Sequence, residues 1–221
     1  MIPWVHLASA TAPDGDTLRL MRRGDEFSIR LSGGNELMNS RLGGSEEALA
    51  RLTLHALDRP APRILIGGLG MGFTLRETLR HAGADARITQ AEIVADQVDW
   101  ARGPMAPVFG DCLSDPRVTL HIGDVADAMA DGPWDAILLD VDNGPDGLTR
   151  PGNDALYSAA GLARAHAALS RGGILSVWSA HADPAFTKRL AAAGLDTLVE
   201  TVRAGRSKRG PKHVIWLARR P

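Results

Sequence analysis

One stretch of the chain decides the fold: Arg63-Ile64-Leu65-Ile66-Gly67-Gly68-Leu69-Gly70-Met71-Gly72-Phe73-Thr74. Its first four residues predict a short buried strand, and a helical pattern follows from Phe73 to His81. The glycines between them permit positive φ angles and let the backbone approach a ligand without a Cβ atom in the way, while the first amides of the helix face the same crevice. A tight strand-to-helix turn needs glycine in any case, so the loop alone does not identify a ligand.

The same alternation of strand and helix continues toward the C-terminus. Helical patterns are expected at 73–81, 95–102 and 156–169, and buried strands at 63–66, 86–91, 118–122, 136–139 and 173–178. Strands that alternate with helices imply a parallel sheet with right-handed crossovers. The sequence therefore predicts a doubly wound, Rossmann-like α/β fold.

The two ends of the chain carry antiparallel patterns instead. Residues 1–43 alternate short apolar runs with Asp-Gly and Gly-Gly turn signals, which predicts two to four antiparallel strands in an N-terminal β-hairpin region. Residues 44–221 would form the main domain, which opens with a helix capped by Ser45. The patterns at 197–202 and 213–217 predict a C-terminal antiparallel hairpin at the edge of the sheet.

Composition excludes several classes of protein. The 221 residues are 44% hydrophobic and 23% charged, which excludes disordered, collagen-like and coiled-coil chains. No apolar run approaches the roughly 20 residues of a membrane span, and no secretory leader is visible, so we expect a cytoplasmic protein without a membrane partner. Cys112, the one cysteine, has no adjacent His or Lys and is expected to be a structural thiol. The seven histidines lack the spacing of a metal site, so no metal is expected.

Charge is distributed unevenly along the chain. Residues 1–202 carry 18 basic and 26 acidic side chains, a net −8, whereas the last nineteen carry +7. The segment 203–213 is either a solvated hairpin tip or a site for an anionic partner. Because the segment has no interleaved aromatic residue and the whole chain has a net charge of only −1, a nucleic-acid partner is not expected.

Acidic side chains follow three of the predicted strands. Glu92 ends the second strand, twenty residues after Gly72, where a carboxylate can accept both ribose hydroxyls of a nucleoside. Asp124 follows the third strand and can accept a hydrogen bond from an adenine amine or cap the next helix. Asp140 and Asp142 follow the fourth. These acids are either solvated loop residues or the surroundings of a cationic ligand such as a sulfonium or an amine.

The combination of the glycine loop, Glu92, Asp124 and Asp140 resembles the S-adenosylmethionine-dependent methyltransferase superfamily. Finer motifs are similar to its spermidine synthase, or polyamine aminopropyltransferase, branch: Thr74-Leu75-Arg76-Glu77, Asp115-Pro116-Arg117-Val118, Gly123-Asp124, Asp135-Ala136-Ile137-Leu138-Leu139-Asp140, Leu156-Tyr157 and Gly172-Gly173-Ile174. The resemblance covers about residues 26–195. It implies a class I methyltransferase fold, and it raises a homodimer as a candidate assembly. It also implies S-adenosylmethionine or its decarboxylated form as co-substrate, bound by Gly67, Gly68, Gly70, Gly72, Glu92 and Asp124.

Further site residues follow from the resemblance. It implies substrate contacts from the helix that contains Glu47, and it places Tyr157 beside the acceptor, although Tyr157 can equally pack in the core. Trp178 stands where the family has a glutamine, and the family's glutamine in the leading β-region aligns with Glu36. Where the family has a second acid after the fourth strand this chain has Asn143, with Asp142 displaced by one position.

These residues predict a transferase. A sulfonium donor would lie across the glycine loop with its ribose on Glu92, and Asp140, with Asp142 beside it, would deprotonate or orient an acceptor amine or other small molecule. The alternatives are methyl transfer from S-adenosylmethionine to an unknown small molecule or RNA, and a non-catalytic nucleoside-binding protein. The family's loop aspartate, which holds the aminopropyl end of the donor, has no counterpart here, whereas Arg76 lies close by. Intact S-adenosylmethionine is therefore expected to compete at least comparably with the decarboxylated form.

Overall fold

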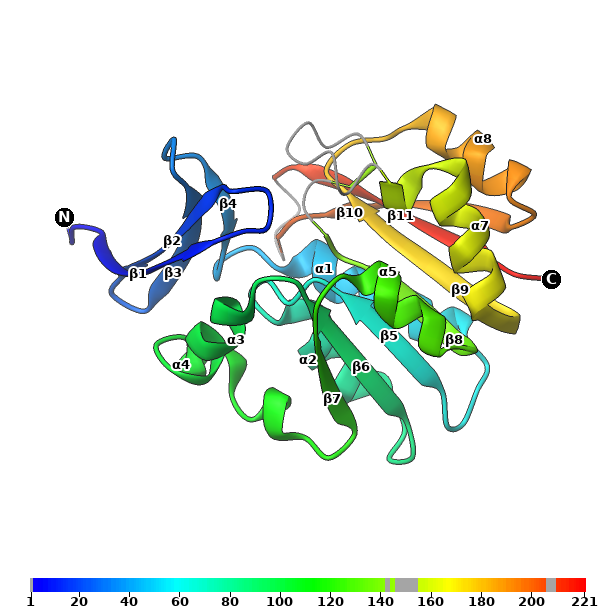
Figure 1. Cartoon of the computed structure of the whole chain (residues 1–221), viewed down its shortest axis with the longest axis horizontal. Helices are drawn as coiled ribbons and strands as arrows, with labels where there is room; N and C mark the ends of the chain where they lie inside the picture. The colour runs from blue at the N-terminus through cyan, green and yellow to red at the C-terminus, as the bar shows by residue number, and fades with distance from the viewer. Residues whose placement is uncertain (1, 142–143, 146–154, 206–209) are drawn as a thin grey trace.

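The computed structural model describes residues 2–141, 144–145, 155–205 and 210–221, which form two β-sheets and the helices around the larger one (Figure 1). The smaller sheet is antiparallel, with strand order β1-β2-β3-β4. Its strands are β1 Val5–Thr11, β2 Thr17–Arg23, β3 Glu26–Leu31 and β4 Glu36–Asn39. Alternate side chains, such as Leu18 and Leu20, are buried on one face of this sheet. The antiparallel strands predicted at the N-terminus are thus confirmed.

The larger sheet has seven strands in the order β10-β11-β9-β8-β5-β6-β7. The five from β9 to β7 are parallel, while β11 is antiparallel to both β9 and β10. The strands are β5 Arg63–Gly67, β6 Arg87–Glu92, β7 Val118–Ile122, β8 Trp134–Leu139, β9 Leu169–Ser179, β10 Asp196–Arg203 and β11 Lys212–Arg219. The doubly wound α/β fold and the C-terminal antiparallel hairpin are therefore confirmed, with β10 as the edge strand.

The order of the parallel strands reverses beside β5. From β5 the chain proceeds outward through β6 and β7, and then returns to form β8 on the other side of β5. In open α/β sheets such a reversal opens a crevice beyond the carboxyl ends of the two central strands. The glycine loop leaves β5 and Asp140 leaves β8 at this crevice.

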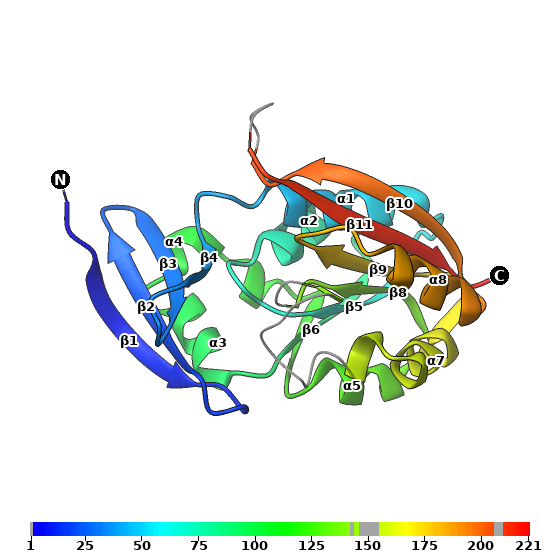
Figure 2. The same ribbon diagram turned by 90° about the horizontal axis from the view of Figure 1, so that it is seen from above.

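Helices cover both faces of the larger sheet. Figure 2 shows α1 and α2 on one side of the sheet and α5 and α7 on the other. The helices are α1 Gly44–Ala56, α2 Phe73–His81, α3 Ala95–Arg102, α4 Ala106–Phe109, α5 Val125–Ala128, α7 Ala159–Ala168 and α8 Pro184–Ala192, with short 3₁₀ turns η1 Cys112–Ser114 and η2 Met129–Asp131. No helix in the described ranges has the length and apolar run that a membrane span needs.

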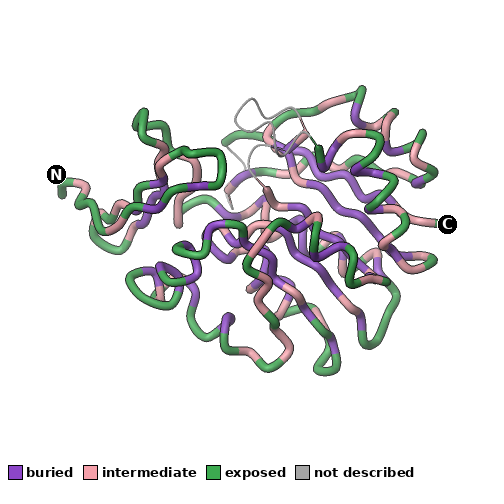
Figure 3. The backbone as a smooth tube through the Cα atoms, viewed as in Figure 1, coloured by how far each residue is buried: buried purple, intermediate pink, exposed green. Residues whose placement is uncertain are grey.

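The core has two layers because neighbouring residues of a strand point to opposite faces. Ile64 and Ile66 pack with the layer of α1, α2 and the smaller sheet, whereas Leu65 between them packs with that of α7 and α8. Figure 3 shows the resulting pattern, with buried strands inside and exposed loops outside. Burying each such side chain contributes about 1.5–3 kcal/mol. These layers hold the strand ends, and hence the crevice, in place.

Ser45 does not cap α1 as predicted. The helix begins at Gly44, the N-cap position is Gly43, and no side chain caps it. Ser45 lies within the first turn, fully buried, and its hydroxyl bonds to Glu46 and to His213 instead. The Ser45 hydroxyl therefore bonds to the side chains of Glu46 and His213 instead of to the free backbone N–H groups at the start of α1.

Candidate functional site

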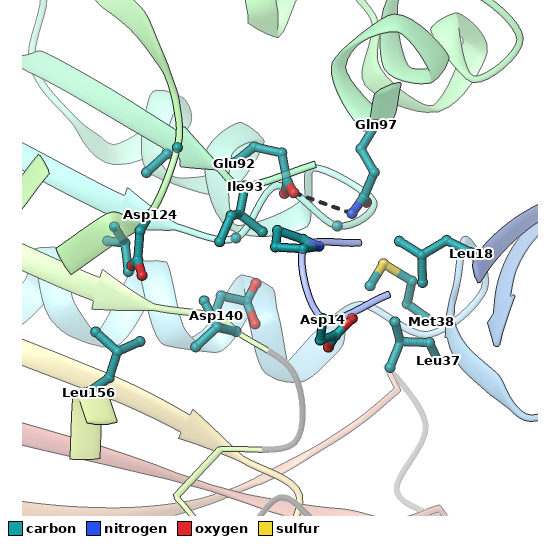
Figure 4. Close-up of a pocket in the computed structure, with 17 residues that line it drawn as sticks. Asp14, Leu18, Leu37, Met38, Glu92, Ile93, Gln97, Asp124, Asp140 and Leu156 are labelled. Carbon is teal, nitrogen blue, oxygen red and sulfur yellow. Dashed lines mark hydrogen bonds between the residues drawn. The ribbon is translucent and has the colours of Figure 1, made fainter. Parts of the chain in front are cut away.

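A cavity of about 390 Å³ lies between the carboxyl ends of β5, β6, β7 and β8 and the smaller sheet. Leu18, Leu37 and Met38 line it from the smaller sheet, and Gly68, Glu92, Asp124 and Asp140 line it from the strand ends (Figure 4). The smaller sheet thus covers the crevice that the strand order creates. Sequence periodicity predicted both parts but carried no information on how they pack together.

The glycine loop is shaped by close packing against its neighbours. Gly68 has a φ of +90°, and a Cβ atom there would lie 2.2 Å from the carbonyl oxygen of Asp140. At Gly72, φ is +71° and a Cβ atom would lie 2.5 Å from the ring of Phe109. Gly68 and Gly70 line the cavity, whereas Gly67 and Gly72 are not lining residues and pack closely against Val125 and Phe109. Of the four glycines predicted to contact a cofactor, two are thus placed to do so directly.

Glu92 lines the cavity from the end of β6 and also holds the glycine loop. It is 5% exposed. Its Oε2 accepts the backbone N–H of Leu69 at 2.9 Å, and its Oε1 accepts the N–H of Val94 at 2.8 Å and the Nε2 of Gln97 at 3.3 Å. The carboxylate therefore accepts three protein donors on the wall where a ribose is expected.

Gln97 and Ile93 were missed by sequence reasoning. Gln97, on α3, is 6% exposed, and its amide reaches Glu92 at the cavity wall (Figure 4). Ile93 follows Glu92 and is 41% exposed, although it is a large apolar residue. With Leu156, it provides an apolar wall at the end of the cavity where Asp124 lies (Figure 4). For Ile93, the sequence offered one signal, an apolar residue directly after the strand-ending Glu92.

Asp124 caps α5, which was one of the two roles predicted for it; the other was contact with an adenine amine. Its side chain accepts the backbone N–H of Ala126 at 2.8 Å. It also lines the cavity and is exposed, so capping leaves it within reach of a ligand.

Asp140 lies where two cavities meet. It follows β8, and its Oδ2 accepts the hydroxyl of Thr74 at 2.5 Å. Besides the larger cavity it lines a smaller one of about 70 Å³, together with Glu46 and Trp178. The other two predicted residues of this loop, Asp142 and Asn143, lie outside the described residues.

The larger cavity is strongly acidic. Four carboxylates line it, those of Asp14, Glu92, Asp124 and Asp140, and no Lys, Arg or His is among its lining residues in the described part of the chain. Asp14 comes from the turn between β1 and β2 and lies on the same side of the cavity as Asp140 in the view of Figure 4. An apolar wall with several carboxylates fits a nucleoside that carries positive charge.

Glu46, rather than its neighbour Glu47, lines the smaller cavity. Burial raises the pKa of Glu46, the nearby Glu47 charge adds to this, and the hydrogen bond from Ser45 opposes it. Trp178 lines the same cavity, with its ring edge-on to that of His213 at a centroid distance of 4.8 Å.

Other predicted residues lie away from the cavities. Tyr157 is buried in the core with its ring edge-on to Phe186, at a centroid distance of 5.6 Å. Glu36 bonds to Ser28, Asn39 and Arg41 within the smaller sheet.

Arg76 and Cys112 have structural surroundings. Arg76 donates to the carbonyl oxygens of Met71 and Val108 and stacks on the ring of Phe73. It is not among the described residues that line either cavity. The expectation that it could hold a donor carboxylate therefore loses its basis. Cys112 is buried, and burial raises the pKa of its thiol to about 11, so the thiol stays protonated at neutral pH. Within the described ranges, no three His, Cys, Asp or Glu side chains are grouped to hold a metal ion.

No family model matches the chain. It is 33% identical over 177 residues to a polyamine aminopropyltransferase from Corynebacterium efficiens, across 76% of this chain and 32% of that protein. The chain is a relative of the spermidine synthases and polyamine aminopropyltransferases. It spans about a third or less of the length of these curated relatives.

The crystal structure of spermidine synthase from Thermotoga maritima superposes with a TM-score of 0.72 at 19% identity, across 96% of this chain and 71% of that one. The fold is thus that of the spermidine synthases, as the resemblance implied. Putrescine N-methyltransferase 3 from Nicotiana tabacum is 39% identical over 97 residues, across 42% of this chain and 25% of that protein.

Proposed function

We propose that this spermidine synthase relative is an aminopropyltransferase, with a sulfonium nucleoside in the larger cavity and an amine in the smaller one. The observation that carries the proposal is the position of Asp140, which lines both cavities at their junction. A reaction between two bound molecules needs such a shared wall, because the reacting atoms must be held about 3 Å apart.

The lining of the larger cavity favours decarboxylated S-adenosylmethionine as donor. That molecule carries a sulfonium and an ammonium group but no carboxylate, and it would meet four acids and no cation among the described lining residues. The carboxylate of intact S-adenosylmethionine would lie among like charges and meet no cation among the described lining residues, which costs several kcal/mol in a partly buried site. This lining supports a preference for the decarboxylated donor, whereas the sequence, with Arg76 close to the loop, predicted that intact S-adenosylmethionine would compete at least comparably.

In the proposed step, the acceptor ammonium loses a proton, and the lone pair of the resulting amine attacks the carbon next to the sulfonium sulfur to give a secondary ammonium. The carbon–sulfur bond breaks, and its electron pair remains on sulfur to give a neutral thioether. Asp140, fixed by Thr74, would orient the amine and take its proton. We retain Asp142 as a second proposed catalytic carboxylate, and Glu46 replaces Glu47 as the acid proposed to meet the acceptor from α1.

Methyl transfer from S-adenosylmethionine to an amine is a second candidate. It is favoured by the similarity to a putrescine N-methyltransferase and by a loop that has Leu69 and Met71 but no aspartate among its glycines.

Incubation with either donor and putrescine, followed by mass spectrometry of the products, separates these proposals. Aminopropyl transfer from the decarboxylated donor adds three carbons and a nitrogen to the amine, whereas methyl transfer adds one carbon. We expect the first product. Only methylated amine would favour the second candidate, and nucleoside-induced thermal stabilisation without turnover on any amine would indicate a binding protein.

A further inference from the structure

A chain of three polar side chains leads away from the smaller cavity. The hydroxyl of Ser45 lies 2.5 Å from Oε2 of Glu46 and 2.8 Å from Nδ1 of His213. Both distances fit strong hydrogen bonds. Glu46 lines the cavity, Ser45 is fully buried, and His213 is partly exposed on β11. The chain thus connects the cavity wall with the side of the molecule where His213 meets solvent.

The Ser45 hydroxyl can donate in either direction. When it donates to Glu46, Nδ1 of His213 donates to the hydroxyl oxygen. When Glu46 is protonated it donates to that oxygen, and the hydroxyl hydrogen points to an unprotonated Nδ1. The two arrangements use the same three groups and differ only in the positions of protons.

We propose that Glu46, Ser45 and His213 form a proton relay, which carries the proton released by the acceptor amine from the smaller cavity to solvent. The proposal rests on the proposed function, because transfer of the aminopropyl group to an acceptor that binds as an ammonium releases one proton per turnover. The acceptor ammonium gives its proton to Asp140, the proposed base, and Asp140 passes a proton on to Glu46, which lines the same smaller cavity. Glu46 passes a proton to the Ser45 oxygen while the Ser45 hydrogen moves to Nδ1 of His213, and the imidazolium formed releases a proton to solvent.

The environment of the two end groups suits proton transfer. Burial raises the pKa of Glu46 and, together with the charge of His181, lowers the pKa of His213. The two values therefore approach each other, which reduces the free energy needed to move a proton between them. The groups that face the relay are Glu47 and Asp140 near Glu46, and Trp178 and His181 near His213.

Ser45→Ala tests the relay with little change in volume. With putrescine at pH 7, we expect kcat to fall by about tenfold or more, within the usual range for lost proton transfer, while the donor KM stays the same. The loss should shrink toward pH 10, because an amine with a pKa near that of lysine then loses its proton to solvent. His213→Ala should behave likewise, and added imidazole should restore part of its rate.

Thr53→Val is a matched control, since Thr53 is also a fully buried hydroxyl on α1 and bonds to Ser176 away from both cavities. It should lower the melting temperature without changing the pH profile. Equal activity of folded Ser45→Ala and the unmodified protein at pH 7 would overturn the relay alone. No turnover by the unmodified protein on any amine would overturn the proposed function, and the relay with it. An NMR titration adds a readout without turnover: Glu46→Gln should lower the pKa of His213, and an unchanged titration would also refute the coupling.

Discussion

Asp140 differs from the other acids of the larger cavity because it also faces the smaller one. Replacing it by Asn keeps the shape and removes the charge. We expect Asp140→Asn to lower kcat by about a hundredfold or more, in the range for a lost general base, while methylthioadenosine still raises the melting temperature. Asp96→Asn, an exposed change in the first turn of α3, should leave both unchanged. Undiminished turnover in Asp140→Asn would remove Asp140 from the proposed reaction.

Glu92 supports the glycine loop and is proposed to hold the ribose, so its replacement should have two effects. In Glu92→Gln, an amide NH₂ replaces one acceptor oxygen, and at least one of the backbone donors that Glu92 satisfies, from Leu69 or Val94, is weakened. We expect a lower melting temperature without ligand and a nearly complete loss of the shift caused by methylthioadenosine, since lost hydrogen bonds to ribose hydroxyls cost about 2–3 kcal/mol. If titration gives equal shifts for both proteins, Glu92 does not hold the ribose.

At the scale of elements, the turn from β5 to α2 separates two kinds of glycine. Gly68→Ala places a Cβ atom 2.2 Å from the Asp140 carbonyl oxygen, and we expect it to destabilise the fold by about 3 kcal/mol or more through strain and overpacking. Gly70 also has positive φ, but its nearest neighbour would be the sulfur of Met38 at 3.5 Å, so Gly70→Ala should cost about 1 kcal/mol. Urea unfolding measures both, and equal losses would contradict this contrast.

The turn before β7 contains a pH-dependent contact. Arg117 donates to both carboxylate oxygens of Asp115 and lowers its pKa to about 2. A carboxylate with a lowered folded-state pKa stabilises the fold above its unfolded value of 3.8 and loses this effect as the pH falls through about 2. Asp115→Asn should therefore be less stable than the unmodified protein at pH 7, and the difference should narrow below pH 4. A difference in unfolding free energy that is constant from pH 7 to pH 2.5 would show that the ion pair is not responsible.

Helices and strands with a clear hydrophobic periodicity could be predicted from the sequence, but the tertiary contacts of their side chains could not. The parallel strands follow from short apolar runs, and the β5 turn from its glycines. Ser45 shows the limit, because a serine before two acids indicates a helix cap, whereas His213, 168 residues away, engages its hydroxyl. Glu46 and Glu47 are equivalent in sequence, and only the rotation of α1 brings Glu46 into the cavity wall.

At the scale of the whole molecule, the acidic cavity should distinguish ligands by charge. Decarboxylated S-adenosylmethionine and methylthioadenosine share the nucleoside, but only the first is cationic. Raising the salt concentration from 50 to 500 mM should weaken binding of the cationic donor and leave the neutral thioether nearly unaffected, because salt screens the attraction to the four carboxylates. Parallel salt dependence of the two ligands in calorimetry would contradict a role for these charges.

The smaller sheet could be predicted as strands but not as part of the site. Its residues Asp14, Leu37 and Met38 line the larger cavity, yet no local pattern separates them from ordinary hairpin residues. Their place at the cavity arises only because the smaller sheet covers the carboxyl ends of the parallel strands. The glycine loop and Glu92 were predictable for the opposite reason, since turn chemistry and strand ends are local features.

The wall that the two cavities share has a thermodynamic consequence. Leu37, Met38, Gly70 and Asp140 belong to both linings, so a molecule in one cavity changes the surface that the other presents. Binding free energies are reciprocal: by whatever factor a bound thioether product alters the affinity for an amine, the amine alters the affinity for the thioether. If the two cavities hold donor and acceptor as proposed, the shared wall therefore couples them, so that the occupancy of one changes the affinity of the other by the same factor in both directions.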